Sequence, residues 1–190
     1  MTGRIGFTPA GPDGIARILI SNPGKLNALD VSMWHGLREA ALAADDGATR
    51  VVIVQGDGAV FASGGDIEEF PQFRFDEARL RDFHENDVAP ALHAMAACDL
   101  PVIAQIDGPC IGGGLEIAAC CDLRICGEAS RFGIPIARLG FPLAPLEARL
   151  VAQVLPPTLL RELLIEARLL DAAEALRRGV VNRVVADGEV

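Results

Sequence analysis

The sequence predicts an α/β fold, because short patterns typical of buried strands alternate with helical stretches along its 190 residues. Residues 51–55 and 102–106 are apolar runs bounded by glycine or proline, and this pattern favours buried strands. Residues 115–121 are apolar and compact enough for a buried helix. With 51% hydrophobic residues the chain is long enough for a large core, and we expect residues 1–190 to form one domain.

The elements are expected to follow one another without a low-complexity linker or an internal repeat. Asp30 is the expected N-cap of a first helix that runs to about Ala44. A longer helical region is expected over residues 76–97, bent or divided near Pro90, because a mid-helix proline loses a hydrogen bond and clashes with the preceding turn. The other expected helices cover residues 144–154, 158–166 and 171–178, and the expected strands cover residues 15–20, 51–55, 102–106, 123–126 and 180–185.

Composition argues against several function classes. The net charge of −9 disfavours non-specific binding to nucleic acid or to an anionic membrane. No apolar run approaches the ~20 residues that span a bilayer, and residues 1–20 lack the pattern of a signal peptide, so we expect a cytoplasmic protein. The odd number and mostly apolar contexts of the cysteines favour small core residues over disulfides or metal ligands. They are Cys98, Cys110, Cys120, Cys121 and Cys126.

The most informative segment is residues 101–122, P-V-I-A-Q-I-D-G-P-C-I-G-G-G-L-E-I-A-A-C-C-D. A predicted strand is followed by three glycines, Gly112–Gly114, at the entrance of a predicted helix. Glycine leaves its N–H unshielded, and the unpaired N–H groups of a first helical turn attract negative charge. Glu116, one turn inside, is placed to transfer protons beside an oxyanion bound there. The alternative is a helix-start carboxylate stabilised by the helix macrodipole.

Four further motifs accompany this segment in a recognisable order. They are N-P-G-K-L-N-A-L at residues 22–29, F-A-S-G-G-D-I at 61–67, R-F-G-I-P at 131–135 and L-L-D-A-A-E-A-L-R-R-G-V-V-N-R-V-V at 169–185. From about residue 15 to 186 the chain resembles the crotonase superfamily, the enoyl-CoA hydratase and isomerase group. The resemblance implies a spiral of repeated strand–strand–helix units, assembled into homotrimers or hexamers. It also implies an acyl-CoA thioester as substrate, with coenzyme A as part of that substrate and no prosthetic group.

The resemblance assigns roles to residues of the reacting centre. The backbone N–H groups of Gly65 and Gly113 are implied to hold the enolate oxygen of the thioester. Such preorganised donors are each typically worth ~2.7–4 kcal/mol in the transition state. Glu116 corresponds to the first of the two catalytic glutamates of the hydratases.

Other residues are implied to follow the nucleotide end of coenzyme A. They are Lys25, Leu26, Ala62, Asp66 and Ile67. Lys25 is the only lysine of the chain, and its ammonium suits a phosphate, although an ordinary surface lysine needs no such reason. Asp66 has an equally good alternative as the N-cap of a helix toward Phe70.

The chain departs from the hydratase pattern at Ile136. Hydratases carry their second glutamate after F-G-x-P, whereas Phe132-Gly133-Ile134-Pro135 is followed here by isoleucine. Hydration divides proton transfers between two carboxylates, while moving a double bond requires one base. The sequence therefore favours enoyl-CoA isomerisation or another single-base reaction. The alternatives are a hydratase with a different second acid and a non-catalytic acyl-CoA-binding protein.

Several side chains are candidates for the missing acid. Glu147 precedes Arg149 at a predicted helix start, a position more typical of an N-terminal-turn carboxylate. His84, Asp87 and His93 lie in the long helical region, where a partly exposed helix face is the more usual setting. Relatives have a glycine-rich segment where this chain has residues 140–150, and the bulkier apolar residues that replace the glycines there should change the wall of the acyl pocket. Relatives usually continue past the last strand into a helical segment, to which nothing in these 190 residues corresponds.

Overall fold

A computed structural model describes residues 3–190 and confirms the α/β class. Its larger sheet has six strands in the order β1-β2-β3-β4-β6-β9. Within this sheet the β1–β2 pair is antiparallel, and the other neighbouring strands run parallel. The strands are β1 (Arg4–Thr8), β2 (Ile15–Ser21), β3 (Val51–Gly56), β4 (Val102–Ile106), β6 (Leu123–Gly127) and β9 (Arg183–Val185).

A smaller sheet carries the segment from which the site begins. Its three strands are β5 (Pro109–Ile111), β7 (Arg131–Gly133) and β8 (Leu170–Asp171), in that order. β5 leads directly into α4 (Gly113–Ala119), and an isolated bridge between Ala62 and Cys110 ties the 61–67 segment to β5. The two glycine motifs are therefore joined through backbone pairing.

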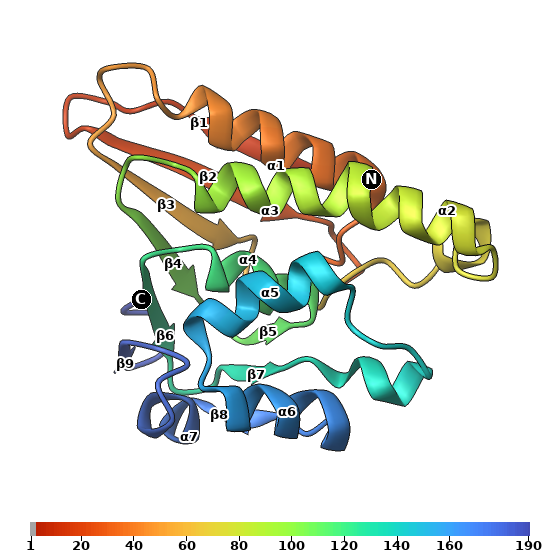
Figure 1. The fold of residues 1–190 in the computed structure, drawn as a ribbon. Helices are drawn as coiled ribbons and strands as arrows, with labels where there is room; N and C mark the ends of the chain where they lie inside the picture. The colour runs from red at the N-terminus through yellow and green to blue at the C-terminus, as the bar shows by residue number, and fades with distance from the viewer. Residues whose placement is uncertain (1–2) are drawn as a thin grey trace.

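Helix α1 (Val31–Ala43) begins where the sequence predicts. Asp30 accepts a hydrogen bond from the Met33 N–H at 2.9 Å, which confirms it as the N-cap. Apolar residues on one face of α1, including Trp34 and Leu37, are buried in the core. In Figure 1 α1 lies beside α3 (Ala89–Ala96) along the strands of the larger sheet.

The long helical region is divided, as predicted, but the division differs from a proline kink. Helix α2 (Glu77–Asp82) passes into a π-helical turn at Phe83–Val88, and α3 follows with Pro90 in its first turn. Helical residues precede Pro90 without a break, so the proline leaves carbonyls of the preceding turn without its N–H, and the wider π turn lies where its ring would otherwise clash. π turns are rare and are frequent at functional sites.

The C-terminal half surrounds α4. Helices α5 (Pro145–Val154), α6 (Pro157–Glu166) and α7 (Ala172–Arg177) match the three predicted helices closely, and α5 packs against α4. The strand predicted over residues 180–185 is shorter, because only Arg183–Val185 pair, with β6. Val180 and Val181 are buried in the turn before β9, which explains their apolar character.

Buried Arg124 holds the end of α4. Its guanidinium donates to the carbonyls of Ala118, Cys121 and Val180, at 2.6 to 3.2 Å. Cys110, Cys121 and Cys126 are buried free thiols, and Cys98 and Cys120 are half-buried. Within residues 3–190 no helix has the length and apolar character needed to cross a membrane.

Candidate active site

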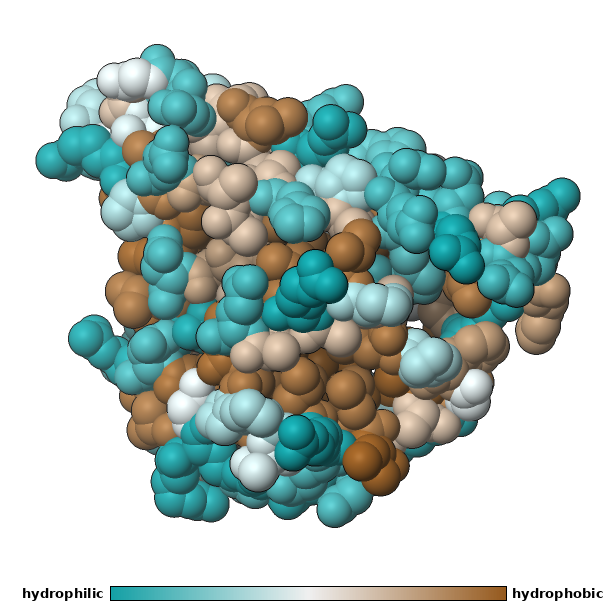
Figure 2. Space-filling model, viewed as in Figure 1, coloured by the Kyte–Doolittle hydropathy of each residue, from teal (hydrophilic) through white to brown (hydrophobic). Residues whose placement is uncertain are grey.

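A pocket of about 710 Å³ opens beside α4. On the face shown in Figure 2, apolar residues gather around a hollow between the α2 end of the molecule and the loop that leads into α5. Its walls come from the two glycine motifs, the 3₁₀ turn Phe70–Gln72, the helical region 77–88 and the segment before α5. Most of the lining is apolar, which suits an acyl chain.

Gly65 and Gly113 line this pocket together. The segments abut so closely that a Cβ on Gly64 would lie 3.3 Å from the Ile111 carbonyl oxygen, and one on Gly114 would lie 2.6 Å from that of Ala62. Gly64 also has a φ of +105°, a conformation that side chains rarely adopt. No backbone acceptor is found within residues 3–190 for the N–H of Gly65 or of Gly113. Both donors are available to a ligand.

Glu116 lies in the first turn of α4 and is 5% exposed. Its carboxylate lines the pocket and makes no hydrogen bond with another described residue. Desolvation by burial raises the pKa of Glu116 well above its ordinary value, and the charge of nearby Glu147 raises it further. Burial therefore favours the protonated form of this group, which faces the pocket.

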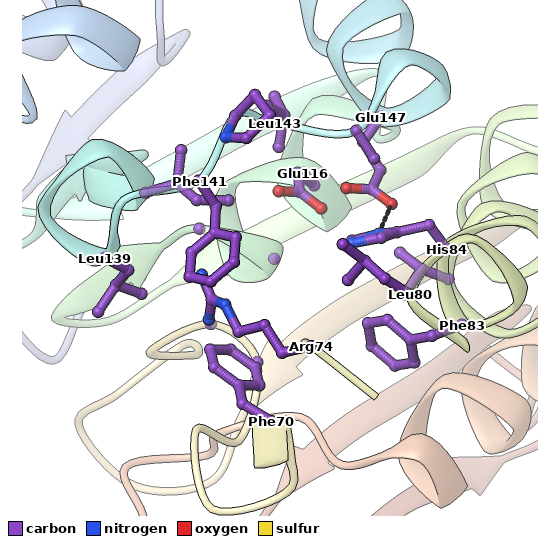
Figure 3. Close-up of a pocket in the computed structure, with 18 of the residues that line it drawn as sticks. Phe70, Arg74, Leu80, Phe83, His84, Glu116, Leu139, Phe141, Leu143 and Glu147 are labelled. Carbon is purple, nitrogen blue, oxygen red and sulfur yellow. Dashed lines mark hydrogen bonds and ion pairs between the residues drawn. The ribbon is translucent and has the colours of Figure 1, made fainter. Parts of the chain in front are cut away.

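Glu147 occupies the first turn of α5, as predicted, but it is buried and faces the same pocket. Its Oε1 lies 2.6 Å from Nδ1 of His84, which comes from the π turn (Figure 3). The position expected for an ordinary helix-start carboxylate therefore also supplies a second acid to the pocket. His84 is partly buried and, through this bond, does more than occupy a helix face.

The other candidate acids and bases lie elsewhere. Asp87 pairs with His35 at 2.6 Å and does not line the pocket. His93 is exposed on α3 and is likewise not part of the lining. Ile136 does line the pocket, in the 3₁₀ turn Pro135–Leu139, so an apolar side chain occupies the place where the resemblance implies a glutamate.

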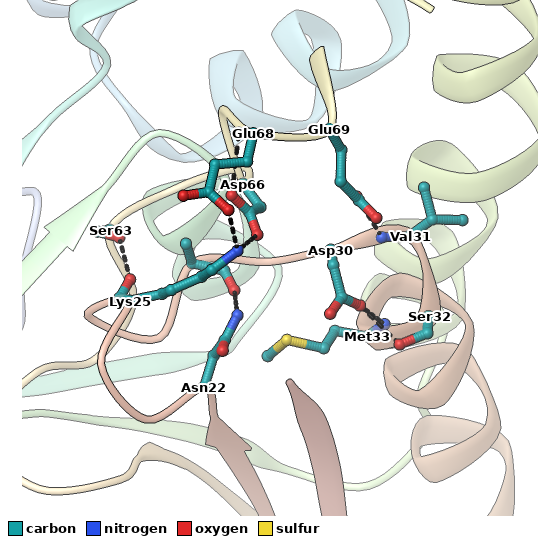
Figure 4. A network of polar contacts seen from close by, with 11 residues as sticks. Asn22, Lys25, Asp30, Val31, Ser32, Met33, Ser63, Asp66, Glu68 and Glu69 are labelled. Atoms are coloured by element: carbon teal, nitrogen blue, oxygen red, sulfur yellow. Dashed lines mark hydrogen bonds and ion pairs between the residues drawn. The ribbon is translucent and has the colours of Figure 1, made fainter. Parts of the chain in front are cut away.

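The residues implied for the nucleotide end of coenzyme A lie in two neighbouring segments (Figure 4). Lys25 donates to Asp66 at 2.7 Å and to Glu68 at 2.8 Å, and this pairing raises the pKa of Lys25. Leu26 and Ile67 are exposed, at 61% and 63%, whereas Ala62 is fully buried. Ile67 alone of the five lines the large pocket.

The N-cap alternative for Asp66 is wrong. A turn and then the 3₁₀ turn Phe70–Gln72 come after it, and the cap position of that turn is Glu69. Asp66 instead accepts hydrogen bonds from the Glu68 N–H at 3.1 Å and from the Lys25 ammonium. Lys25 lies 41 positions from Asp66 in the sequence, so the local pattern around Asp66 does not reveal this ion pair.

Sequence reasoning missed one conspicuous feature of the pocket. The guanidinium of Arg74 lies over the ring of Phe141, with 3.1 Å between guanidinium carbon and ring centroid, and 4.2 Å from the ring of Phe70 (Figure 3). Arg74 and Phe141 come from loops 67 positions apart; Arg74 stands in no recognisable motif, and Phe141 lies in the segment where bulky residues replace the family's glycines. That departure was a signal for Phe141, whereas nothing in the sequence pointed to Arg74.

Comparison with known proteins agrees with this architecture. The family model of enoyl-CoA hydratase/isomerase matches residues 10–190. A probable enoyl-CoA hydratase of Mycobacterium leprae is 34% identical over 177 residues, covering 91% of this chain and 67% of that protein. A carnitinyl-CoA dehydratase of Salmonella enteritidis is 35% identical over 192 residues, covering 100% of this chain and 71% of that protein.

Solved structures similar to this one belong to the same family. An enoyl-CoA hydratase/carnithine racemase from Magnetospirillum magneticum superposes with a TM-score of 0.91 at 39% identity, covering 96% of this chain and 68% of that one. A putative enoyl-CoA hydratase/isomerase family protein from Hyphomonas neptunium gives 0.90 at 31% identity, covering 97% and 70%. The chain therefore belongs to the enoyl-CoA hydratase/isomerase family of the crotonase superfamily.

Proposed function

We propose that this protein reversibly hydrates an enoyl-CoA thioester, with Glu116 and Glu147 as its two acid–base groups. The observation that carries the proposal is the burial of both carboxylates in one apolar pocket that also contains the free N–H groups of Gly65 and Gly113. Among the reactions expected from the sequence, this favours the hydratase with a different second acid over the single-base reaction.

The oxyanion is the first requirement. When a nucleophile adds to C3 of a 2-enoyl thioester, negative charge moves onto the thioester oxygen. Donors that point at this oxygen before the reaction stabilise the charge without reorganisation. The N–H groups of Gly65 and Gly113 supply two such donors, on backbone segments that close packing holds against each other.

The two carboxylates then divide the proton transfers. Glu147 takes a proton from water as the water oxygen bonds to C3, and its hydrogen bond to His84 fixes the orientation of the carboxylate. Glu116, whose raised pKa favours its protonated form, donates its proton to C2 as the enolate collapses. One water is added across the double bond, and dehydration is the reverse. A proton passing from Glu147 to Glu116, directly or by exchange of both groups with solvent, restores the starting state.

Isomerisation is a second candidate, supported by a specific observation. Ile134 and Ile136 make the pocket wall apolar near the place where the family's second glutamate stands. A wall of this kind disfavours a bound water, and Glu116 alone could then move a proton from C2 to C4 of a 3-enoyl thioester through the dienolate.

The experiment compares products and variants together. A panel of 2-enoyl and 3-enoyl thioesters is incubated with the full-length protein, and products are identified by mass, since hydration adds one water and isomerisation adds nothing. Glu116→Gln and Glu147→Gln should each lower hydration by ~10² to 10⁴, the usual contribution of a general acid or base. Glu85→Gln is the matched control, because exposed Glu85 lines the same pocket and should change the rate less than about twofold.

The outcomes separate the three hypotheses. Loss of hydration in both variants supports the two-acid reaction. Isomerisation that needs Glu116 but not Glu147 contradicts it and favours the single base. Tight binding of thioesters without turnover of any would instead identify a non-catalytic acyl-CoA-binding protein.

A further inference from the structure

Arg74 carries a charge that no group of residues 3–190 balances within the pocket. Of the two arginines that line it, Arg81 lies 3.2 Å from Glu77 and 3.9 Å from Glu85. Arg74 has no carboxylate within ion-pair distance among the described residues, and its guanidinium donates no hydrogen bond to them. Desolvation lowers the pKa of Arg74, so its surroundings do not compensate for the water it has lost.

The guanidinium is nevertheless held in place. The rings of Phe141 and Phe70 lie at 3.1 and 4.2 Å from its central carbon, and cation–π contacts of this kind fix the plane of the group. Contacts with ring faces leave the N–H donors at the edge of the guanidinium unused. A planar, fixed guanidinium with free edge donors matches the two oxygens of a carboxylate.

We infer that the acyl group of the substrate carries a terminal carboxylate, which Arg74 binds. This rests on the proposed function and names its substrate class: the monothioester of a dicarboxylic acid with coenzyme A. The location supports the acyl end of the substrate over its nucleotide end. Arg74 lies in the pocket that holds Gly113 and Glu116, whereas Lys25 and Asp66 are not part of its lining.

Charge also explains why this cation is useful in an acidic site. Glu77, Glu85 and Glu147 line the same pocket, and their negative charge would repel an anionic acyl group. A single fixed cation gives such a group one position in which it is stabilised. The alternative is a purely structural role, in which Arg74 only links the 70–76 loop to the 139–145 segment through its contacts with the two rings.

The test measures binding and turnover with matched thioesters. Each pair has the same enoyl chain and ends either in a methyl group or in a carboxylate, at several chain lengths. The wild type should prefer the carboxylated member by about 10- to 100-fold in kcat/KM, which corresponds to a hydrogen-bonded charge pair. Dissociation constants measured with Glu116→Gln should show the same preference in binding without turnover.

Variants identify the residue responsible. Arg74→Met keeps an apolar stem against the two phenylalanines and should remove the preference, while changing kcat/KM for the methyl-terminated member less than about threefold. Arg79→Met is the matched control, because exposed Arg79 also lies near the start of α2, removes the same charge and does not line the pocket. It should leave the preference unchanged. An equal loss of kcat/KM for both thioesters in Arg74→Met would show that Arg74 has only a structural role, and it would overturn the inference.

Two further arms separate the remaining explanations. Pantetheine thioesters lack the phosphates of the nucleotide, so an Arg74 effect that disappears with them would place the contact at a coenzyme A phosphate and overturn the carboxylate assignment. A wild type that prefers methyl-terminated thioesters overturns it even if no Arg74 variant folds. Failure of the proposed function is distinct, since then no thioester, carboxylated or not, is hydrated by the wild type.

Discussion

Glu147 and His84 meet across the pocket from segments 63 positions apart, with 2.6 Å between the carboxylate Oε1 and the imidazole Nδ1. The carboxylate is 3% exposed, so His84 provides the only hydrogen bond found for its side chain within residues 3–190. Under the proposed function, Glu147 takes the part of a glutamate that the motif pattern places at Ile136.

The first prediction concerns His84 as a positioning residue. His84→Ala should lower kcat for the proposed hydration by about 10- to 100-fold with little change in KM, because a buried carboxylate without its donor loses its orientation. His84→Gln, which can donate from a similar distance, should recover part of the loss. His93→Ala is the control, since His93 is exposed on α3 and should leave kcat unchanged. A rise in KM with no change in kcat would contradict the positioning role.

A second prediction links Glu116 to stability. Its folded-state pKa is raised, so the folded protein is favoured below the pKa of the unfolded carboxyl and loses that stability as pH rises through the folded pKa. Glu116→Gln should therefore be more stable than the wild type at alkaline pH, by on the order of 1–3 kcal/mol, the usual cost of burying a polar group without a partner. The difference should shrink toward acid pH in denaturant unfolding. A variant less stable than the wild type at every pH would refute this.

Much of the framework, but less of the pocket, could be predicted from sequence. The runs at residues 51–55 and 102–106 form β3 and β4, as predicted. A short apolar run indicates a buried strand even when its neighbours in the sheet are not known. By contrast, β5 and β7 have three residues each and depend on pairing with segments far away in the sequence, namely each other, β8 and the Ala62 segment. The glycine motifs indicated a shared site, whereas the contacts of Arg74 with Phe141 and of Glu147 with His84 arise from tertiary folding alone.

A third prediction concerns Lys25 and coenzyme A. Lys25→Ala should weaken the binding of acyl-CoA by up to about fivefold, as expected for a partly exposed charge pair, with little loss of fold. Glu68→Gln should strengthen binding, because it leaves more of the ammonium free for a phosphate. Thermal shift with acyl-CoA measures both, since a ligand of the folded state raises the melting temperature. Pantetheine thioesters should be unaffected by either change; an equal effect on them would place Lys25 away from the phosphates.

The fourth prediction concerns the support of α4. Arg124→Met removes donors from three carbonyls at and beyond the end of the helix that carries Glu116, and it should destabilise the fold by about 2–4 kcal/mol in denaturant unfolding. Arg149→Met, an exposed arginine on α5, should change stability by less than about 0.5 kcal/mol. Equal effects of the two substitutions would show that the buried guanidinium contributes nothing specific.

The π turn at Phe83–Val88 has a consequence for how this site can change. It places one extra residue between α2 and α3, and each residue added to an α-helix rotates the rest of that helix by about 100°. Leu80 and His84 can thus face the acyl pocket while Leu92 and Met95 face the core beside α1. The extra residue thus sets how far α3 is rotated about the helix axis relative to α2. Shortening the turn by one residue would force a choice between keeping His84 at Glu147 and keeping the core in register, so acyl specificity can vary on one side of this turn while the other side stays packed.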